Sequence, residues 1–226
     1  MNFETWEPVY EELLADFGFD RREDERARDV LAELTESFCE SRLGSIEGAT
    51  VAVAGAGPSL PEELTLAADA GYVIAASTAA DTLLEHDIQP DLMVTDIDKN
   101  PETARKCTQR GTPVAVHAHG DNLSLVERWV PQFDSENVLA TTQAEPSGPV
   151  KNFGGFTDGD RGAFLADHFG AGRIAFPGWD FDDPAVSAMK ARKLEWAERL
   201  LYWLETRRNE RFSVLDGRRS EIASFN

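Results

Sequence analysis

Two aspartates stand two residues apart at the end of an apolar run, a pattern that could bind a metal ion. The run Asp91–Thr95 is predicted to be a strand, and Asp96 and Asp98 follow it. In an extended chain, residues i and i+2 point to the same side, so the two carboxylates would converge. Carboxylate oxygens suit Mg²⁺, which commonly bridges phosphate groups. A turn-capping role would explain either aspartate alone, but the pair favours a metal site.

A third acid, Asp121, follows the next predicted strand in the segment His117–Asn122. His117 and His119 precede it and could be taken for a zinc pair. No third zinc ligand stands near them in the sequence, and the neighbouring acids indicate Mg²⁺ instead. We therefore predict that Asp121 joins the two strand-end aspartates as a catalytic, metal-binding group. We expect His119 to orient phosphate or to position Asp121, and His117 to be packed in the interior.

A glycine-containing turn, Gly55–Leu60, joins a predicted strand to a predicted helix. Glycines let the backbone approach a phosphate, and a helix N-terminus adds N–H groups and the positive end of its dipole. Gly55, Gly57 and Ser59 are therefore predicted to bind phosphate. The turn is not a P-loop, because no Gly-Lys-Ser/Thr follows, and Leu60 stands where a dinucleotide fingerprint needs glycine. A tight strand-to-helix turn without a ligand is the alternative.

A second glycine-rich stretch, Asn152–Ala163, contains two acids and an arginine just before a predicted helix. Arg161 is a natural partner for a phosphate oxygen. Asp158 and Asp160 could cap the helix or add to the metal site. A loop so rich in glycine is costly in conformational entropy, which favours a functional role in phosphate binding.

These residues are positioned by short apolar runs that alternate with helical patterns from residue 49 onward. The alternation predicts parallel βαβ units and a doubly wound, mostly parallel α/β sheet with helices on both faces. Ligands bind outside the carboxyl ends of such strands, where the acids and glycines stand. The predicted strands are 50–54, 72–76, 91–95, 113–117, 138–142 and 173–176. The predicted helices are 61–70, 78–86, one that opens at Pro101, 123–129 and 162–169.

The flanks of this region are predicted to be helical. Residues 1–48 form a charged helical N-terminal segment that ends near two glycines, and residues 49–208 form the catalytic α/β domain. A long C-terminal helix spans 185–208, with one apolar stripe that includes Leu201 and Leu204. The polar tail 209–226 is expected to be a hairpin or a frayed end.

The charge balance is strongly acidic. Lys and Arg number 22 and Asp and Glu number 41, so the formal net charge is 22 − 41 = −19. This balance argues against a broad basic surface for nucleic acid. An acidic excess with ordinary aromatic content favours a halophilic protein, in which salt screens the self-repulsion. An ordinary acidic protein from a low-salt organism is the alternative.

The remaining composition favours a cytoplasmic protein without a membrane partner. Cys39 and Cys107 are the only cysteines and have no metal-ligand spacing, so we expect buried or bystander thiols. The first residues lack a basic region followed by an apolar run. No apolar stretch approaches the roughly 20 residues of a membrane helix.

Four motifs in order resemble those of archaeal 6-hydroxymethyl-7,8-dihydropterin diphosphokinases. The resemblance covers roughly residues 49–182. The central segment also resembles the core of thiamine pyrophosphokinase, where a Gly-Asp-x-Asp-Ser element ends a strand. Thr95 and Lys99 replace its glycine and serine here, which argues against thiamine as the acceptor. The motifs are Gly55–Leu60, Asp91–Asp98, His117–Asn122 and Gly155–Arg161.

The resemblance implies a Mg²⁺-dependent transfer of diphosphate from ATP to 6-hydroxymethyl-7,8-dihydropterin, with release of AMP, in folate or methanopterin biosynthesis. From the residues themselves, we assign ATP phosphates to the glycine turns together with His119, Asp158, Asp160 and Arg161. The alternatives are thiamine pyrophosphokinase-like transfer, a glycan-linked or flagellin-linked relative, and a nucleotide-binding domain without chemistry. Three acids at strand ends argue against the last. The general base and the oligomeric state, a homodimer included, are left open.

A pterin acceptor would need a flat site with a carboxylate at one edge. An aromatic ring can stack on the pterin face, and a carboxylate can accept hydrogen bonds from its pyrimidine edge. Asn122, Phe156, Trp179 and Asp180 are predicted to supply these groups. Trp179 covering the sheet edge is the alternative.

Overall fold

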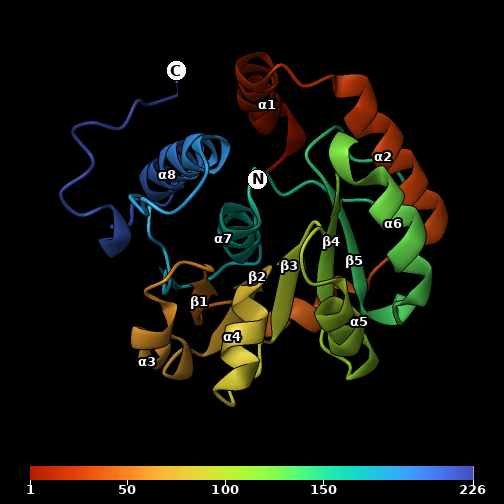
Figure 1. Ribbon diagram of the computed structural model, residues 1–226, viewed down its shortest axis with the longest axis horizontal. Helices are drawn as coiled ribbons and strands as arrows, with labels where there is room; N and C mark the ends of the chain where they lie inside the picture. Colours follow the sequence, from red (N-terminus) through yellow and green to blue (C-terminus); the bar gives the residue numbers. More distant parts are fainter. Residues whose placement is uncertain (226) are drawn as a thin grey trace. The chain divides into compact units, whose positions relative to one another are not determined.

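The computed structural model describes residues 1–225 (Figure 1). They form two compact units. The first unit combines residues 1–42 with 91–154, and the second combines residues 43–90 with the chain from 155 onward. Each unit therefore contains two segments that are far apart in the sequence. The predicted domain boundaries at residues 48 and 208 stay predictions.

The first unit contains three parallel strands in the order β5-β4-β3. Their apolar runs are buried along the whole length of each strand, as expected for parallel strands covered by helices. Helices α2 and α6 lie side by side and α2 packs on β4 and β5 (Figure 1), while α5 packs on β3 and β4. The bounds are α1 Phe3–Phe17, α2 Arg21–Leu34, β3 Leu92–Thr95, α5 Pro101–Gln109, β4 Val114–Ala118, α6 Leu123–Trp129 and β5 Val138–Thr142.

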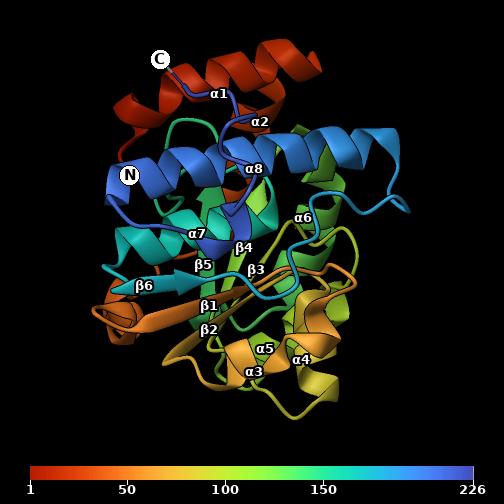
Figure 2. The same cartoon turned by 90° about the vertical axis from the view of Figure 1, so that its left-hand side faces the viewer.

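The second unit contains three parallel strands in the order β2-β1-β6. Helix α7 packs on β1 and β2, and α8 packs on α7. Figure 2 shows α7 above these strands and α3 and α4 below them, so helices cover both faces. The bounds are β1 Thr50–Ala54, α3 Leu64–Ala68, β2 Tyr72–Ala76, α4 Ala79–Glu85, α7 Asp158–His168, β6 Arg173–Ala175 and α8 Ala188–Arg208.

Short 3₁₀ segments of three to seven residues lie between or after these helices and strands. They are η1 Glu40–Ile46, η2 Leu60–Glu62, η3 Gly120–Asn122, η4 Val130–Gln132, η5 Ser135–Asn137 and η6 Ser213–Leu215. Asn2, Asp20 and Ser187 cap the helices α1, α2 and α8 with their side-chain oxygens. No helix within the described residues is both long enough and apolar enough to span a bilayer.

The predicted α/β class is confirmed, and all strand pairings given above are parallel. Pro101 opens α5 at its first position as predicted, and α6 and β5 have the predicted bounds.

Three predicted elements are corrected by the structure. The helix predicted over 61–70 is divided into η2 and the short α3. The helix predicted over 162–169 begins four residues earlier, at Asp158. The hairpin proposed for 209–226 is replaced by the 3₁₀ turn η6 in the described part of that tail, and residue 226 lies outside the described residues.

Candidate active site

The turn that follows β3 carries the first two predicted metal ligands, and it is not extended. Strand β3 ends at Thr95, and Ile97 between the two aspartates has a positive φ of 57° with a fully buried side chain. The extended conformation predicted for Asp96 to Asp98 is therefore wrong. Thr95 Oγ1 accepts the Ile97 N–H at 2.9 Å, and Asp96 Oδ1 accepts the Asp98 N–H at 3.3 Å. Asp98 itself is exposed.

His119 links this turn to the one that carries Asp121. Its Nδ1 accepts the Asp121 N–H at 3.3 Å, and its Nε2 lies 3.5 Å from Asp96 Oδ2. Because Nδ1 acts as the acceptor, the neutral ring carries its proton on Nε2, which faces the Asp96 carboxylate. Both side chains are less than one-fifth exposed. His119 therefore orients the Asp96 carboxylate and the backbone of Asp121.

Asn122 ties the ends of β3 and β4 together. Its side-chain oxygen accepts the His119 N–H at 3.0 Å. Its amide group donates to the carbonyl oxygens of Asp96 at 2.8 Å and His117 at 2.7 Å. The side chain is buried, so these bonds give Asn122 a positioning role, and its contact with a pterin stays a prediction. His117 is buried, as expected, and its Nδ1 lies 3.1 Å from Thr141 Oγ1.

The carboxylate of Asp24, from the first turn of α2, supports the same loop. Asp24 Oδ1 accepts the Gly120 N–H at 2.7 Å, and Oδ2 accepts from Tyr10 Oη at 2.8 Å and Gln143 Nε2 at 2.7 Å. Burial, together with the neighbouring Asp24, raises the pKa of Tyr10 well above its usual value, so the hydroxyl stays a donor. Asp24 was not among the residues predicted from the sequence. An acid in the first turn of a charged helix is so common that no signal distinguished it.

Within residues 1–225, no three His, Cys, Asp or Glu side chains are arranged as ligands of one metal ion. The described contacts join Asp96 to Asp98 and, through His119, to the backbone of Asp121. The acids thus belong to two connected turns. Carboxylate oxygens are the type of ligand that Mg²⁺ prefers. Joint binding of one ion by the three carboxylates stays a prediction.

In the second unit, the N–H groups of the glycine turn are bonded to the turn that follows β6. Gly55 donates to the Pro177 carbonyl and Gly57 to the Gly178 carbonyl, each at 2.9 Å. Ser59 donates its N–H to Asp180 Oδ2 at 3.0 Å. A Cβ atom on Gly55 would lie 2.6 Å from the Gly178 oxygen, so close backbone approach explains the glycine. Phosphate binding by this turn stays a prediction, and the tight-turn alternative accounts for its glycines.

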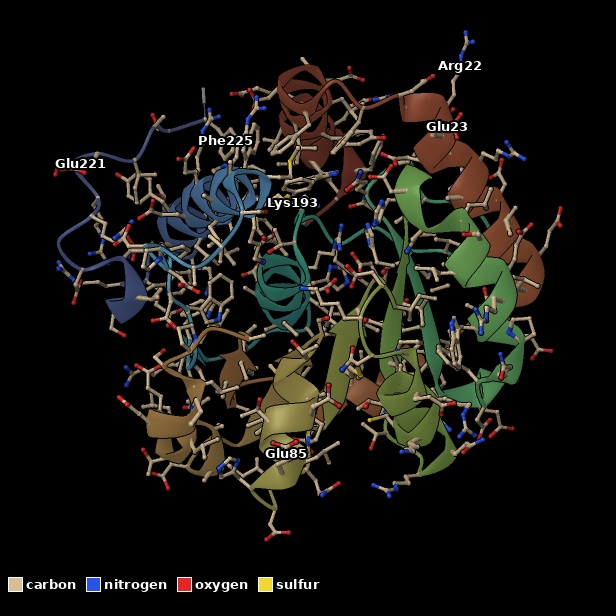
Figure 3. The ribbon with its side chains drawn as sticks, in the orientation of Figure 1. Arg22, Glu23, Glu85, Lys193, Glu221 and Phe225 are labelled. Carbon is tan, nitrogen blue, oxygen red and sulfur yellow. The ribbon has the colours of Figure 1, made fainter. Side chains whose placement is uncertain are left out.

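The aromatic residues predicted for the pterin have protein partners. Trp179 Nε1 donates to the Val53 carbonyl at 2.8 Å, and the ring lies against Gly159, where an added Cβ would come within 2.7 Å. Phe156 is buried, 6.5 Å edge-on from Trp196, with Lys193 of α8 5.6 Å from its ring centre. Figure 3 labels Lys193 on α8. Both rings therefore hold α7 and its neighbours together.

Two acids stand in the first turn of α7, and one of them completes its N-terminal cap. Asp160 is fully buried and accepts the N–H groups of Phe156 and Thr157 and the Thr157 hydroxyl, the last at 2.6 Å. Burial raises the pKa of Asp160, although these donors oppose the shift. Asp158 pairs with Arg161 at 3.0 Å, one turn along the helix. The capping alternative is thus realised for Asp160, and phosphate contacts by these residues stay predictions.

Comparison with known proteins gives a consistent result over nearly the whole chain. A family described as "6-hydroxymethylpterin diphosphokinase MptE-like" matches residues 26–185. The chain is 41% identical over 225 residues to a protein of Methanothermobacter thermautotrophicus, with 91% of this chain and 96% of the relative covered. It is 38% identical over 234 residues to one of Pyrococcus furiosus, with 96% and 99% covered.

A third relative, from Methanocaldococcus jannaschii, is 32% identical over 234 residues, with 91% of this chain and 96% of the relative covered. All three relatives are named 6-hydroxymethyl-7,8-dihydropterin pyrophosphokinase. The family predicted from the four motifs is therefore confirmed. The chain belongs to the MptE-like family of 6-hydroxymethylpterin diphosphokinases.

Proposed function

We propose that this protein transfers a diphosphate group from ATP to the hydroxymethyl group of 6-hydroxymethyl-7,8-dihydropterin in a methanopterin-type pathway. The observation that carries the proposal is the 41% identity over 91% of the chain to a relative of that name. The hydrogen-bonded turns with Asp96, Asp98 and Asp121 supply acids of the type that the reaction requires. Neither thiamine transfer nor a purely binding role has a comparable observation in its favour.

In the proposed reaction, the pterin hydroxyl oxygen attacks the β-phosphorus of ATP. The bond between the β-phosphorus and the oxygen that bridges to the α-phosphate breaks, AMP leaves, and the hydroxyl proton passes to a base or to water. When bound, Mg²⁺ supplies charge neutralisation on the phosphate oxygens. Asp96, Asp98 and Asp121 would hold it. Catalysis then depends on positioning and on stabilising developing charge rather than on a covalent nucleophile.

Two further sets of roles are part of the proposal. ATP phosphates are assigned to Gly55, Gly57, Ser59, His119, Asp158, Asp160 and Arg161, and the pterin to Asn122, Phe156, Trp179 and Asp180. Asp160 caps α7, and Asp180 accepts the Ser59 N–H. A test of ligand binding by either residue must therefore distinguish loss of a ligand contact from loss of these hydrogen bonds. Among the residues assigned to the ATP phosphates, Arg161 is a cation that can donate hydrogen bonds to a phosphate oxygen, and it pairs with Asp158.

The test is an acceptor comparison. The protein is incubated with ATP and Mg²⁺ and either 6-hydroxymethyl-7,8-dihydropterin or thiamine, and AMP is measured by chromatography. We expect AMP with the pterin, in a one-to-one ratio with pterin diphosphate, and none above background with thiamine. AMP with thiamine alone would favour the rival family. ATP binding without AMP from either acceptor would favour a non-catalytic domain.

A further inference from the structure

Three acidic side chains are buried within residues 1–225, and one of them has no assigned role. Asp160 caps α7, and Glu205 pairs with Arg219. Asp24 is only 3% exposed, and its described partners are three neutral donors. Burying a carboxylate is costly unless hydrogen bonds satisfy it. The position of this one is therefore set by those three donors.

The donors come from three separate parts of the first unit. Tyr10 lies on α1, and its hydroxyl reaches Asp24 on α2. Gln143 follows β5, and its carbonyl oxygen also accepts Trp6 Nε1 of α1 at 2.9 Å. The remaining donor is the Gly120 N–H, in the turn after β4. The two N-terminal helices are thus connected, through one carboxylate, to a loop at the carboxyl end of the strands.

Gly120 shows how closely α2 approaches this loop. A Cβ atom on Gly120 would lie 2.7 Å from the Cβ of Glu23, the neighbour of Asp24. Figure 3 labels Glu23 at the first turn of α2. Gly120 stands between His119 and Asp121, so its N–H holds both neighbours in place. His119 in turn faces the Asp96 carboxylate at 3.5 Å.

We propose that Asp24 is a positioning residue for the acid turns, and that this is the role of the N-terminal helices in catalysis. Asp24 fixes the Gly120 N–H, the fixed turn orients His119, and His119 orients Asp96. The inference rests on the proposed function, because only there do Asp96 and Asp121 take part in the reaction. Displacements near 1 Å in such a site cost roughly 10²-fold in rate.

The first experiment measures the loop directly and requires no turnover. Amide hydrogen exchange of Gly120 is followed by NMR in the unaltered protein and in Asp24→Asn. We expect the Gly120 amide to exchange slowly in the unaltered protein, because its N–H is bonded to a buried acceptor, and clearly faster in the variant. An unprotected Gly120 amide in the unaltered protein overturns the proposal whether or not any variant folds, and so does equal protection in both proteins.

The second experiment separates positioning from simple destabilisation. Far below the melting temperature, Asp24→Asn should lower kcat by about tenfold or more, raise the Mg²⁺ concentration for half-maximal rate, and leave the pterin KM nearly unchanged. Tyr10→Phe keeps the Gly120 bond and should retain kcat within about twofold. An exposed acid on the same helix, Asp29→Asn, is the matched control.

Gly120→Ala tests the same contact from the other side, because its added Cβ would push the turn away from α2. It should reproduce the loss of kcat, while Gly44→Ala, where an added Cβ meets nothing within 4 Å, should not. A folded Asp24→Asn protein with unchanged kcat and unchanged Mg²⁺ dependence overturns the proposal. If the unaltered protein itself produces no AMP, the proposed function fails, and the exchange experiment still decides whether Asp24 holds the loop.

Discussion

The turn that carries Asp96 and Asp98 places a β-branched side chain in an uncommon backbone conformation. A buried isoleucine with φ of 57° is a genuine outlier, and such strain costs on the order of 1–3 kcal/mol. Hydrogen bonds to Thr95 Oγ1 and Asp96 Oδ1 hold the turn on either side of Ile97. Strained residues cluster at functional sites, so this conformation supports the assignment of the two acids.

The first prediction concerns Asp96. Asn has the same shape but lacks the negative charge, so Asp96→Asn should lower kcat by about 10²-fold or more, as expected for loss of a group that stabilises phosphoryl transfer. Its Oδ1 can still accept the Asp98 N–H, so the melting temperature should change little. Steady-state kinetics and thermal melts check both, with the exposed Asp29→Asn as control. Near-normal turnover would show that Asp96 is not a ligand of the catalytic metal ion.

The second prediction tests whether Asp180 binds the pterin or only its own loop. A pterin contact predicts that Asp180→Ala raises the pterin KM much more than the ATP KM, through loss of about 1–3 kcal/mol of binding. The structural bond to the Ser59 N–H instead predicts a lower melting temperature and similar changes in both constants. Measuring the two KM values and the melting temperature of one variant distinguishes these outcomes.

At the scale of elements, apolar runs predicted the strands well because parallel strands are largely buried, and β2, β4 and β5 are buried over their whole length. Helix α7 was harder to predict, since Gly159 made its first turn look like part of a loop. The pair Thr157 and Asp160, three residues apart, stabilises that turn by capping. In a sequence, such a cap is recognised only by two polar residues three positions apart. The same two residues are equally typical of a phosphate-binding loop. The structure shows the cap, while phosphate binding by the same loop stays a prediction.

Tertiary contacts of the candidate site were the least predictable part. Nothing in the sequence near Asp24 indicates that its partner is Gly120, 96 residues away. The turn-to-turn bonds of Gly55 and Gly57 likewise join segments more than 100 residues apart. Motif spacing therefore predicted where the turns lie in the sequence, but not the long-range hydrogen bonds that stabilise them.

The third prediction concerns Glu205, which joins the end of α8 to the C-terminal segment. Burial would raise its pKa, but hydrogen bonds from Arg219, at 2.7 Å to each oxygen, and from the Phe212 N–H hold the pKa below its usual value. A carboxylate with a lowered folded-state pKa stabilises the protein above its unfolded pKa, and this contribution is lost as the pH falls through the folded pKa. Stability from Glu205 should therefore be complete at neutral pH and decline below about pH 4.5.

Glu205→Gln keeps the volume but removes the charge. At pH 7 it should lower the free energy of unfolding by about 1.5–3 kcal/mol, the range for hydrogen bonds to charged groups. The difference from the unaltered protein should shrink as the pH falls below 4. Urea melts at pH 7, 5 and 3.5 check this, with the exposed Glu221→Gln as control. Figure 3 labels Glu221 on the C-terminal segment. A constant difference across pH would exclude the charge as the cause.

At the scale of the whole molecule, each compact unit is assembled from two separate segments of the chain. The chain passes between units near residues 42, 90 and 154. The first crossing lies inside the 3₁₀ turn η1, and the last lies between Gly154 and Gly155, in the glycine-rich stretch that was predicted to bind phosphate. Sequence patterns therefore predicted the fold class and the alternation of elements, but they could not predict how the segments group, because grouping depends on tertiary contacts rather than on local composition.

The net charge of −19 leads to the last prediction, that stability rises with salt. Two effects compete. Salt weakens exposed ion pairs such as Arg211–Asp216, but each is worth only about 0–1 kcal/mol. Salt also screens the repulsion among the excess acids, since the Debye length falls from about 10 Å at 0.1 M to about 3 Å at 1 M. With 41 acids against 22 bases, repulsion is the larger effect.

The melting temperature should therefore increase between 0.1 M and 2 M, and by similar amounts in NaCl and KCl, because screening by a monovalent cation depends on ionic strength and not on the identity of the ion. Scanning calorimetry at constant pH measures this. The pH must stay near 7, so that protonation of carboxylates does not reduce the repulsion independently. An uncharged solute at equal osmolality is the control, and it should reproduce only a small part of the increase. A melting temperature that stays flat or falls with salt would mean that repulsion among the acids is not the larger effect. The halophilic interpretation of the composition would then be wrong.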